Sequence, residues 1–555
     1  MDRNWWKEAV VYQIYPKSFM DSNGDGIGDL RGIEQKLDYL CELGVDAVWI
    51  CPFYQSPMVD NGYDISDYYA IDPVFGSMED MEALIAEAKK RDIKILVDLV
   101  LNHTSSQHIW FRKALADPSS KYRDYYIFRN GKPEKEPSNW RGCFGGNVWE
   151  SMGEDLYYYH TFDKEQPDLN WENPQLRKEV YDIINYWIGK GVGGFRIDAI
   201  TYIKKNQDFP ALPPDGSDGL ASLFSVSQNE AGIDEFLQEM KEATYGKYDM
   251  LTVAEAPGVP YDGLGPYIGE KGHFSMIFDF SYNDIDVDES SNWYVKKEWS
   301  MKDVRDAVFK SQISIQEVGW GALYLENHDQ PRCLNKYIPE EDIGYYSAAA
   351  LAGMYFFLRG TPFIYQGQEL GMTNTFFERI EDTKDLASVD QYQRALLAGL
   401  DKAEALEIAN KRSRANTRTP MQWSSGQGAD FTKATPWIAI NDNYKKINAK
   451  EQQEDMDSIF HFYRKLISLR KDTLWKEVLI YGDIQPRFLD YPSVIAYERS
   501  AGEKKVLVIT NFSKENISLE VGISQILLDN YKDTIVNKNY ILLRAYETVM
   551  IEEKY

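Results

Sequence analysis

Eight short apolar runs, most of them separated by amphipathic helical stretches, constrain the fold of this chain more than any other feature. We expect strands at Val10–Tyr15, Asp46–Ile50, Ile93–Val97, Gly193–Ile197, Met250–Ala254, Met276–Phe280, Ala322–Leu325 and Pro362–Tyr365. Helices are expected in most of the intervals, for example over Met78–Lys90 and Pro174–Gly189. Near-continuous apolar strands that alternate with helices are typical of a parallel sheet covered on both faces. Eight such units predict an α/β fold of the (β/α)8, or TIM barrel, type. The alternative, a six-stranded doubly wound sheet, has no GxGxxG turn in its favour.

Two stretches depart from this rhythm and predict additional domains. Residues 104–171, after the third strand, are rich in Trp, Tyr, Gly and Asn and are expected to form an inserted subdomain. The barrel then comprises residues 1–103 and 172–479. The charged helical segment Glu378–Arg412 is expected over the barrel mouth. Residues 480–555 are expected to form a C-terminal antiparallel, sandwich-like β-domain, with strands beginning just before it, at Val478–Tyr481, Val494–Arg499, Lys505–Thr510 and Glu547–Ile551.

Charge and composition narrow the classes of partner. The formal net charge is −26, which argues against nucleic acid and anionic membranes, because phosphate binding needs a basic surface. The N-terminus has no run typical of a signal peptide, and the most apolar stretch, Tyr346–Leu358, is too short to span a bilayer and is expected to be a buried helix. Four cysteines without metal spacing predict reduced thiols in a cytoplasmic protein. Aromatic residues make up 14% of the chain, which indicates stacking on sugars, although large cores also use them.

Acidic and basic residues cluster where the predicted strands end. These residues are Asp98 and His103 after the third strand, Arg196 and Asp198 at the fourth, Glu255 after the fifth, and His328, Asp329 and Arg332 after the seventh. Active sites of barrel enzymes lie at the carboxyl ends of the strands, so we expect these side chains to converge on one mouth. A single carboxylate at a strand end is more often a helix cap or a loop ligand. Three carboxylates at the ends of strands four, five and seven, all facing one mouth, favour a catalytic site over an accidental cluster.

A pair of carboxylic acids can cleave a glycosidic bond when one is ionised and the other holds a proton. Arg196 and Asp198 stand two residues apart on a strand, so they share a face, and the cation is expected to favour the charged form of Asp198. Glu255 has apolar neighbours in the sequence, where desolvation would raise its pKa. No pair of histidines has HExxH spacing, so a catalytic zinc ion is not expected.

The strand-end segments resemble the α-amylase family, glycoside hydrolase family 13. The family's conserved regions are similar to DLVLNH (98–103), GFRIDAI (194–200), TVAEAPG (252–258) and LENHD (325–329). Three further segments, QPDLNW (166–171), DNGYDISDY (60–68) and RTPMQW (418–423), resemble its oligo-1,6-glucosidase and α-glucosidase branch. The similarity runs through essentially the whole chain. It implies a retaining α-glucosidase in which Asp198 is the nucleophile, Glu255 the general acid and then base, and Asp329 the stabiliser of the transition state.

The resemblance also implies a set of substrate-binding residues. Hydrogen bonds to the sugar or to the nucleophile would come from His103, Arg196 and His328, and Arg332 is a further candidate. Tyr63 would stack on the sugar ring. Asp60 and Arg418 would pair, grip the hydroxyls of the non-reducing end and close the pocket beyond one glucose. That closure implies exo action, so short oligosaccharides are the expected substrates. The enzyme is expected to be a monomer.

The loop after the first strand carries oxygen ligands at regular spacing. Asp21, Asn23, Asp25 and Asp29 occupy positions 1, 3, 5 and 9 of an EF-hand-like loop, and Ile27 at position 7 offers its backbone carbonyl. Position 12 is Gly32 and not the bidentate glutamate, so a complete EF-hand is excluded. In the branch that this chain resembles, the loop binds a structural divalent ion, usually calcium. We therefore expect a structural Ca²⁺ ion here, with a solvated acidic turn as the alternative.

The expected linkage preference rests on Ala199, the residue after the implied nucleophile. In the resembled branch this position tends to be Val in enzymes that act on α-1,6 bonds and Thr in those that act on α-1,4 bonds. Alanine offers room and no hydroxyl, which favours α-1,6 bonds, with maltose or sucrose cleavage as alternatives. Phe144 and Phe162 of the insertion are expected to line the pocket, and Trp149 suits a pocket wall or a core equally well.

Other functions of the same scaffold stay open. A glucosyl transferase would share the covalent intermediate, and a trehalose-phosphate hydrolase would need extra Lys or Arg near the mouth. The segment SYNDID (281–286) after the sixth strand differs from the RLDRD-like segment of sucrose isomerases, which argues against isomerase activity. A catalytically inactive binding subunit is the alternative from another class, but the three expected carboxylates are all present.

Overall fold

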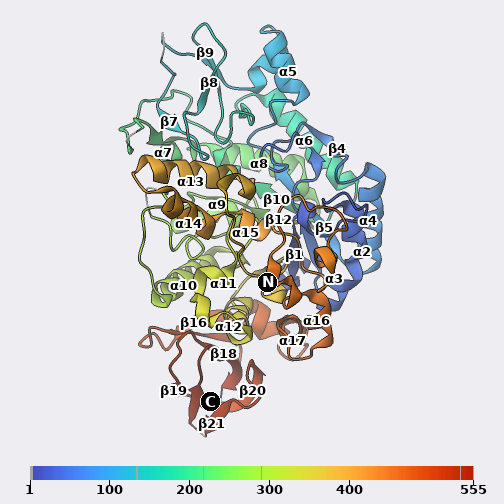
Figure 1. Ribbon diagram of the computed structural model, residues 1–555, viewed down its shortest axis with the longest axis vertical. Helices are drawn as coiled ribbons and strands as arrows, with labels where there is room; N and C mark the ends of the chain where they lie inside the picture. The colour runs from blue at the N-terminus through green and yellow to red at the C-terminus, as the bar shows by residue number, and fades with distance from the viewer. Residues whose placement is uncertain (1–3, 133–134, 217, 289–290, 538, 554–555) are drawn as a thin grey trace.

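The computed structural model describes residues 4–132, 135–216, 218–288, 291–537 and 539–553. Within them, eight parallel strands close into a barrel, and each overlaps one of the eight predicted strands (Figure 1). In order around the barrel they are β1 (Val11–Ile14), β2 (Ala47–Ile50), β5 (Lys94–Val100), β10 (Gly194–Asp198), β12 (Leu251–Ala254), β13 (Met276–Phe278), β14 (Gly321–Leu323) and β15 (Thr361–Tyr365). The predicted (β/α)8 barrel is therefore confirmed.

Helices cover the outside of the barrel (Figure 1). They include α2 (Leu30–Gln35), α3 (Leu37–Leu43), α4 (Met78–Lys90), α6 (Pro174–Gly189), α8 (Ile233–Ala243), α10 (Met301–Val318), α11 (Cys333–Tyr337), α12 (Tyr345–Phe356) and α17 (Ile459–Lys471). Local sequence determines where they begin. Ser77 and Asp80 cap each other's backbone N–H groups at the start of α4, and Asn173 caps α6 just before Pro174. Both helices begin and end where the sequence predicts. The apolar helix α12 is buried, also as predicted.

Several short elements complete the barrel domain. They are α1 (Trp5–Glu8), the antiparallel pair β3 (Tyr54–Gln55) and β4 (Asp67–Ile71), α7 (Phe224–Ser227), α9 (Gly265–Ile268) and α16 (Ala449–Glu454). Among the residues that the structure describes, no helix has both the length and the apolar character needed to cross a membrane.

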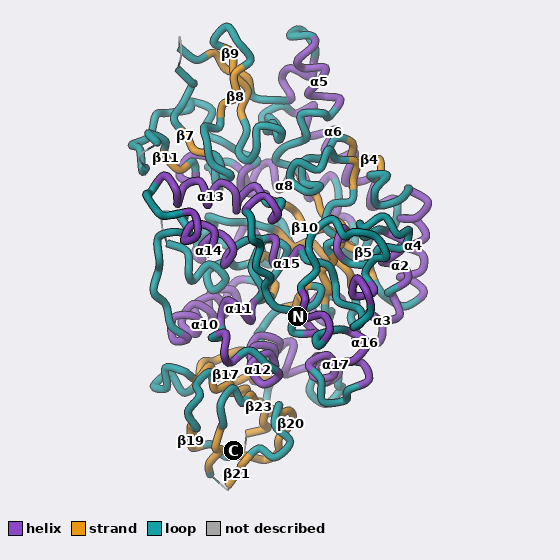
Figure 2. The backbone as a smooth tube through the Cα atoms, in the orientation of Figure 1, coloured by secondary structure: helices purple, strands orange, loops and turns teal. Residues whose placement is uncertain are grey.

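The segment between β5 and α6 projects from one end of the barrel and is mostly loop (Figure 2). It contains α5 (Ile109–Ala116) and a small antiparallel sheet of β6 (Phe128–Asn130), β9 (Leu156–Tyr159) and β8 (Trp149–Ser151). Its β7 (Trp140–Arg141) pairs with β11 (Ala221–Ser222), which comes after β10. The apolar core of this region likewise includes Tyr202, Phe209 and Val226. The residues that follow β10 thus pack onto the insertion and lie between it and the barrel.

The C-terminal region forms two antiparallel sheets at the opposite end of the molecule (Figures 1 and 2). One sheet contains β16 (Asp483–Arg487), β17 (Val494–Ala501), β18 (Lys504–Asn511), β23 (Thr548–Glu553) and β20 (Ile523–Asp529). The other contains β19 (Ile517–Glu520), β22 (Tyr540–Leu543) and β21 (Ile535–Asn537). Three of the four strands predicted for this region are present as β17, β18 and β23. The expected antiparallel β-domain is confirmed.

The fourth predicted strand, Val478–Tyr481, is wrong. These residues belong to a π-helical turn, η11 (Glu477–Tyr481). The guanidinium of the buried Arg499 donates hydrogen bonds to the carbonyl oxygens of Leu479, Ile480 and Gly482, at 2.7 to 3.0 Å. Arg499 thus stabilises the carbonyl end of this turn, and the apolar run is buried by tertiary contacts without joining a sheet.

The predicted charged segment, Glu378–Arg412, folds into helices beside the end of the barrel at which the strands terminate. It contains η8 (Ile380–Thr383), α13 (Leu386–Leu397) and α14 (Lys402–Arg412), and the short helix α15 (Ala415–Arg418) follows. The carbonyl oxygen of Lys384 accepts a hydrogen bond from Asn61. The carboxylate of Asp390 on α13 lies so close to Gly145 of the insertion that a Cβ there would be 2.0 Å from it. The segment therefore contacts both the insertion and the barrel loops.

Candidate active site

A cavity of about 170 Å³ lies at the carboxyl ends of the barrel strands. It is lined by Asp60, Tyr63, His103, Phe144, Phe162, Asp198, Ala199, Tyr202, Glu255, Pro257, Asp329 and Arg414. Asp198 ends β10, Glu255 follows β12, and Asp329 lies in the loop after β14. The fold thus brings three strand-end carboxylates that are far apart in the sequence into one small cavity, as the sequence analysis expects.

One arginine contacts two of these carboxylates. Arg196 is 2% exposed, and its Nη1 lies 2.6 Å from Asp198 Oδ1 and 2.9 Å from Asp98 Oδ1. Its Nη2 lies 2.7 Å from Glu255 Oε2. The contact with Asp198 follows from the two-residue spacing on β10, because alternate residues of a strand share a face. A single guanidinium therefore holds Asp198 and Glu255 next to each other.

Three carboxylates share the single charge of Arg196, and this affects Asp198. Burial raises the pKa of Asp198 well above its usual range; Arg196 opposes the rise, and the charges of Glu255 and Asp98 add to it. Arg196 favours the charged form of Asp198, as the sequence analysis expected, but burial outweighs its effect on the pKa. Ionisation of one carboxyl group in this cluster therefore opposes ionisation of Asp198.

The surroundings of Glu255 also differ from the expected apolar pocket. Besides Arg196, its Oε2 accepts a hydrogen bond of 3.0 Å from the backbone N–H of Ala199. Ala199 adopts a left-handed conformation (φ 41°, ψ 38°), which is uncommon for a residue other than glycine and is often found at functional sites. One of its apolar sequence neighbours, Pro257, lines the same cavity, while the carboxylate itself is hydrogen-bonded to polar groups.

Asp329 lies among cationic side chains. Its Oδ2 is 3.0 Å from His328 Nε2, and its Oδ1 is 3.0 Å from Arg418 Nη2 and 3.2 Å from Arg414 Nη1. Burial alone would raise the pKa of Asp329, but these neighbours hold it well below its usual range. Burial likewise opposes a charge on His328, yet the adjacent Asp329 raises the pKa of the imidazole to about 10. At neutral pH Asp329 is therefore ionised.

The ion pair that closes the far end of the cavity differs from the predicted one. Asp60 Oδ1 lies 3.3 Å from Arg414 Nη2, whereas the predicted partner Arg418 is 1% exposed and donates to the His328 carbonyl oxygen and to Asp329. Arg414 Nε also lies 2.6 Å from Oδ1 of the buried Asp385, at the start of α13. Burial raises the pKa of Asp60 to about 6, against the charges of Arg414 and Arg418.

Aromatic rings form the rest of the wall. The Tyr63 ring stacks on His328 with centroids 5.3 Å apart and an interplanar angle of 9°. Phe162 lies 5.2 Å from the His103 ring and 5.6 Å from Phe144. Burial lowers the pKa of His103 to about 4, so this imidazole is neutral and serves as a hydrogen-bonding group.

The remaining predicted residues lie outside the wall. Arg196, His328 and Arg418 are buried behind it, where they hold the carboxylates. Arg332 is fully buried away from the cavity and binds Glu326 and the Gln366 carbonyl oxygen at 2.9 and 2.8 Å. Trp149 packs edge-on against Phe209 and Tyr159 in the core of the insertion.

Three lining residues were missed by the sequence analysis: Tyr202, Pro257 and Arg414. A signal was available for two of them. Arg414 stands one helical turn before Arg418, and Pro257 is two residues after Glu255. The position of Tyr202 depends on the turn at Ala199 and had no local signal.

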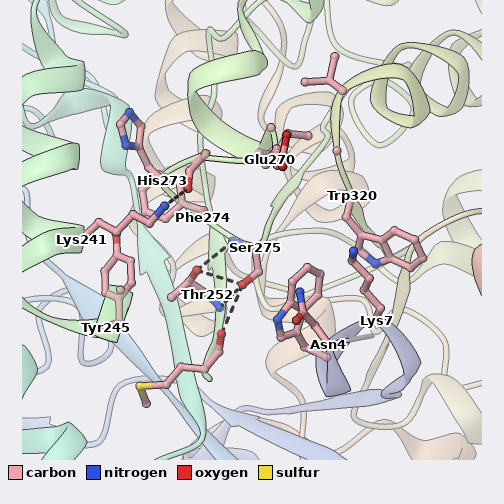
Figure 3. Close-up of a pocket in the computed structure, with 18 of the residues that line it drawn as sticks. Asn4, Lys7, Lys241, Tyr245, Thr252, Glu270, His273, Phe274, Ser275 and Trp320 are labelled. Carbon is pink, nitrogen blue, oxygen red and sulfur yellow. Dashed lines mark hydrogen bonds between the residues drawn. The ribbon is translucent and has the colours of Figure 1, made fainter. Parts of the chain in front are cut away.

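A second, larger cavity of about 650 Å³ lies at the opposite, amino-terminal end of the barrel (Figure 3). Thr252 and Ser275 in its wall are hydrogen-bonded to each other, and Lys241 donates to the Gly272 carbonyl oxygen at 2.6 Å. Its polar groups are thus largely satisfied within the protein, and the strand-end carboxylates are at the other end of the barrel. We therefore assign the chemistry to the smaller cavity.

The predicted metal loop folds around its own backbone. Asp21 accepts hydrogen bonds from the N–H groups of Asn23, Gly24 and Gly26, and Asn23 and Asp25 each accept one from the residue two positions on. Asp29 caps α2 by accepting from Gly32. Within the described ranges, no group of three or more His, Cys, Asp or Glu side chains is arranged to hold a metal ion. Asn23 and Asp25 each keep lone pairs for an ion, whereas Asp21 already accepts two hydrogen bonds on each carboxylate oxygen, from Asn23, Gly24, Gly26 and Thr432. The donor set has the chemistry of a Ca²⁺ site, provided that the ion displaces some of the bonds to Asp21.

Comparisons with known proteins agree with this geometry. The family model for the α-amylase catalytic domain matches residues 13–482, and the model for the C-terminal domain of the α-amylase SusG matches residues 494–550. An oligo-1,6-glucosidase of Parageobacillus thermoglucosidasius is 44% identical over 99% of this chain and 98% of its own. Two solved structures cover all of both chains: isomaltulose synthase from Erwinia rhapontici NX5 (39% identity, TM-score 0.95) and trehalose-6-phosphate hydrolase from Bacillus licheniformis (40% identity, TM-score 0.91).

Proposed function

The chain belongs to the α-amylase family of glycoside hydrolases, and on that premise we propose that it is an exo-acting oligo-1,6-glucosidase. It releases glucose from the non-reducing ends of short α-glucosides and prefers α-1,6 bonds. The observation that carries the proposal is the cavity itself: it is small and lined at one side by the Asp60–Arg414 ion pair. Its volume is below the ~300–1,000 Å³ of pockets for larger ligands, which suits one sugar ring and not the middle of a long chain.

We propose that Asp198 and Glu255 perform a double displacement. Asp198 attacks C1 of the glucosyl unit while the C1–O bond breaks, and the proton of Glu255 passes to the leaving oxygen. In the second step Glu255 takes a proton from water, the water oxygen bonds to C1, and Asp198 leaves. Their shared contact with the Arg196 guanidinium supports carboxyl groups close to the ~5 Å spacing of retaining enzymes, and not the ~6.5–9.5 Å of inverting ones.

The proton needed for the first step comes from the carboxylate cluster. Asp98, Asp198 and Glu255 all contact Arg196, and the charges of Glu255 and Asp98 raise the pKa of Asp198, so ionisation of one carboxyl group disfavours that of its neighbour. In the reactive state that proton is on Glu255, and Arg196 neutralises Asp198. Asp329, kept ionised by His328 and the two arginines, faces the positive charge that develops at the sugar ring.

Substrate groups meet the remaining wall. Asp60 and Arg414 hydrogen-bond the hydroxyls at the non-reducing end, and neutral His103 adds a further hydrogen bond. Tyr63, supported by His328, packs against the apolar face of the ring, while Phe144 and Phe162 exclude water on the side of the insertion.

The deciding experiment compares glucose release from isomaltose, maltose and sucrose as kcat/KM. A preference for isomaltose of tenfold or more is the expected result. A preference for maltose or sucrose would contradict the linkage and leave the catalytic residues unaffected, because one methyl-sized difference at Ala199 is worth only about 1–3 kcal/mol.

The named relatives point to alternatives that the cavity argues against. Of the described residues that line it, Arg414 is the single Lys or Arg, and three carboxylates already bind it. No cation is left in this wall for a sugar phosphate. A glucosyl transferase is the second candidate. It would use the same glucosyl-enzyme intermediate, with a sugar hydroxyl in place of water as the acceptor.

We further propose a structural Ca²⁺ ion in the loop after β1. Asp21, Asn23, Asp25 and Asp29 supply side-chain oxygens and Ile27 its carbonyl oxygen, a donor set of the kind that calcium prefers. The ion would brace the loop and has no step in the reaction. We also propose a monomeric enzyme in the cytoplasm, in keeping with a cavity formed by one chain and with scattered cysteines that are not paired.

A further inference from the structure

The leaving group of the reaction must lie on the side of the cavity where Glu255 donates its proton. Three lining residues are connected to that carboxyl group: Ala199 donates its backbone N–H to it, Tyr202 follows Ala199 in the same turn, and Pro257 is two residues further along the Glu255 loop. The Asp60–Arg414 pair contributes to another part of the wall, which holds the glucosyl ring. The residue with a polar group on the leaving-group side is therefore Tyr202.

The position of Tyr202 is set by the turn that follows β10. Ala199 in its left-handed conformation reverses the chain, and the N–H of Tyr202 donates to the Ala199 carbonyl oxygen at 3.0 Å. The Tyr202 side chain is 6% exposed and packs edge-on against Phe162, with ring centroids 5.8 Å apart. The same turn that aims an N–H at Glu255 thus brings the tyrosine to the cavity wall.

Gln228 orients the phenol of Tyr202 through a hydrogen bond. Its Nε2 donates to Tyr202 Oη at 3.0 Å. The Gln228 side chain packs against Gly258, where an added Cβ would lie 2.3 Å from Gln228 Oε1, so glycine is needed for this close approach. Gln228 therefore lies between Tyr202 and the loop that carries Glu255 and Pro257, and it fixes the two parts of this wall relative to each other.

The Tyr202 hydroxyl keeps a hydrogen that it can donate. Burial raises the pKa of Tyr202 well above its usual range, so the phenol is protonated at neutral pH. The oxygen accepts from Gln228, and the Cys143 thiol contacts the same oxygen at 4.0 Å. The bond from Gln228 uses the oxygen as an acceptor and does not engage the phenol hydrogen. The contact with the sulfur, at 4.0 Å, is at the outer limit of a hydrogen bond, so this hydrogen can pass to a ligand oxygen at a shorter distance.

We propose that Tyr202, oriented by Gln228, is a specificity-determining residue that donates a hydrogen bond to a hydroxyl of the leaving sugar. The inference rests on the proposed α-glucosidase activity, since it assigns the leaving-group side of that site. The hydrogen bond from Tyr202 distinguishes substrates by their leaving group. A leaving sugar has hydroxyl oxygens that can accept this bond, whereas a leaving nitrophenol has no hydroxyl oxygen at the corresponding position. A site built to bind a substrate hydroxyl disfavours analogues that lack it.

The test compares Tyr202→Phe with the wild type on isomaltose and on 4-nitrophenyl α-glucoside. We expect kcat/KM for isomaltose to fall by about 3- to 10-fold, as for the loss of one neutral hydrogen bond, and that for the aryl glucoside to change less than twofold. Tyr159→Phe is the matched control, because the Tyr159 hydroxyl is buried in the insertion and does not line the cavity. It should leave the ratio of the two substrates unchanged.

Gln228→Met provides a second route to the same answer. It removes the donor that orients the phenol and retains side-chain length against Gly258, so the substrate ratio should fall in the same direction but by less. Combined with Tyr202→Phe it should have no additional effect on the ratio, since both changes act on one hydrogen bond. Equal losses on both substrates, or an unchanged ratio in both single variants, would overturn the proposal.

The outcome can be separated from that of the linkage proposal. If the wild type prefers maltose to isomaltose, the α-1,6 assignment fails, and the ratio is then measured with maltose in place of isomaltose. A selective loss on the disaccharide still supports the role of Tyr202, and an unselective loss still overturns it.

Discussion

Arg414 Nη2 lies 3.3 Å from Asp60 Oδ1, so the arginine just before α15 pairs with a carboxylate from the loop between β3 and β4 in the wall of the catalytic cavity. The arginine has a third and closer partner outside the cavity, Asp385, whose Oδ1 lies 2.6 Å from Nε. Asp385 is buried and caps α13, the helix that also contacts the insertion through Asp390. The segment over the barrel mouth is thereby connected to the residues that hold the glucosyl unit.

The first prediction concerns this connection. Asp385→Asn keeps a side chain that can cap α13 but removes the charge that fixes Arg414. We expect kcat/KM for isomaltose to fall by about 10-fold, mostly through KM, as for the loss of a hydrogen bond to a charged group. The acidic limb of the pH profile should also move to lower pH. Asp60, with a pKa of about 6, would share Arg414 with one carboxylate fewer, and a stronger cation lowers the pKa of an acid.

The control for this prediction is Asp382→Asn in the same segment. Asp382 forms an exposed ion pair with Arg379, so its loss should alter neither KM nor the pH profile. If Asp385→Asn lowers thermal stability but leaves KM and the pH profile as in the wild type, its role is structural only.

The barrel could be predicted from the sequence because its signal is local and repeated. Each of the eight strands is an apolar run ended by polar residues, and a strand-end position is enough to place Asp198, Glu255 and Asp329 at one mouth. The strand predicted at Val478–Tyr481 failed because an apolar run does not by itself distinguish a strand from a buried helical turn. Here the deciding contact comes from Arg499, a residue distant in the sequence.

The cavity wall was only partly predictable, for a related reason. Asp60 was identified, but its partner could not be, because Arg414 and Arg418 differ only in which one α15 turns toward the cavity. The electrostatics were also only partly predictable. Arg196 favours the charged form of Asp198, as expected, but burial and two further carboxylates at the same guanidinium, which no local pattern indicates, raise its pKa.

The second prediction separates the proposed acid from the proposed nucleophile. Glu255→Gln should lower kcat on isomaltose by about 10²- to 10⁴-fold, the usual contribution of general acid–base catalysis. Formation of the glucosyl-enzyme from α-glucosyl fluoride should be affected far less, because fluoride leaves without a proton. Asp198→Asn should abolish turnover of both substrates. Burst kinetics measure the first step directly, and equal losses of that step in Glu255→Gln on the two substrates would contradict the acid role.

The third prediction concerns the loop after β1. If Ca²⁺ binds at about 100 times its Kd, it should stabilise the folded protein by about 2.7 kcal/mol, and EDTA should lower the Tm accordingly. Asp25→Asn should remove most of this EDTA effect, whereas the exposed Asp249→Asn should retain it. A Tm that does not respond to EDTA, together with no tightly held ion in elemental analysis, would show that the loop is a solvated turn.

The last prediction concerns a buried carboxyl group outside the catalytic cavity. Glu369 accepts hydrogen bonds from the hydroxyls of Tyr12 and Tyr39 at 2.8 and 2.6 Å, and its Oε2 is buried without a partner. Burial raises the pKa of Glu369 to about 7, from an ordinary value of 4.5. Between these values the folded protein holds a proton that the unfolded chain releases, so stability falls as pH rises from about 4.5 to about 7 and is constant beyond.

Glu369→Gln removes this titration and keeps an oxygen for the two tyrosines. The Tm of the variant relative to the wild type should therefore be higher at pH 8 than at pH 5. The difference corresponds to a free energy on the order of 3 kcal/mol. The exposed Glu270→Gln is the control and should show the same relative Tm at both pH values. A relative Tm of Glu369→Gln that is equal at the two pH values, or higher at pH 5, would mean that Glu369 is ionised in the folded enzyme and that its buried charge is compensated by Arg332 nearby.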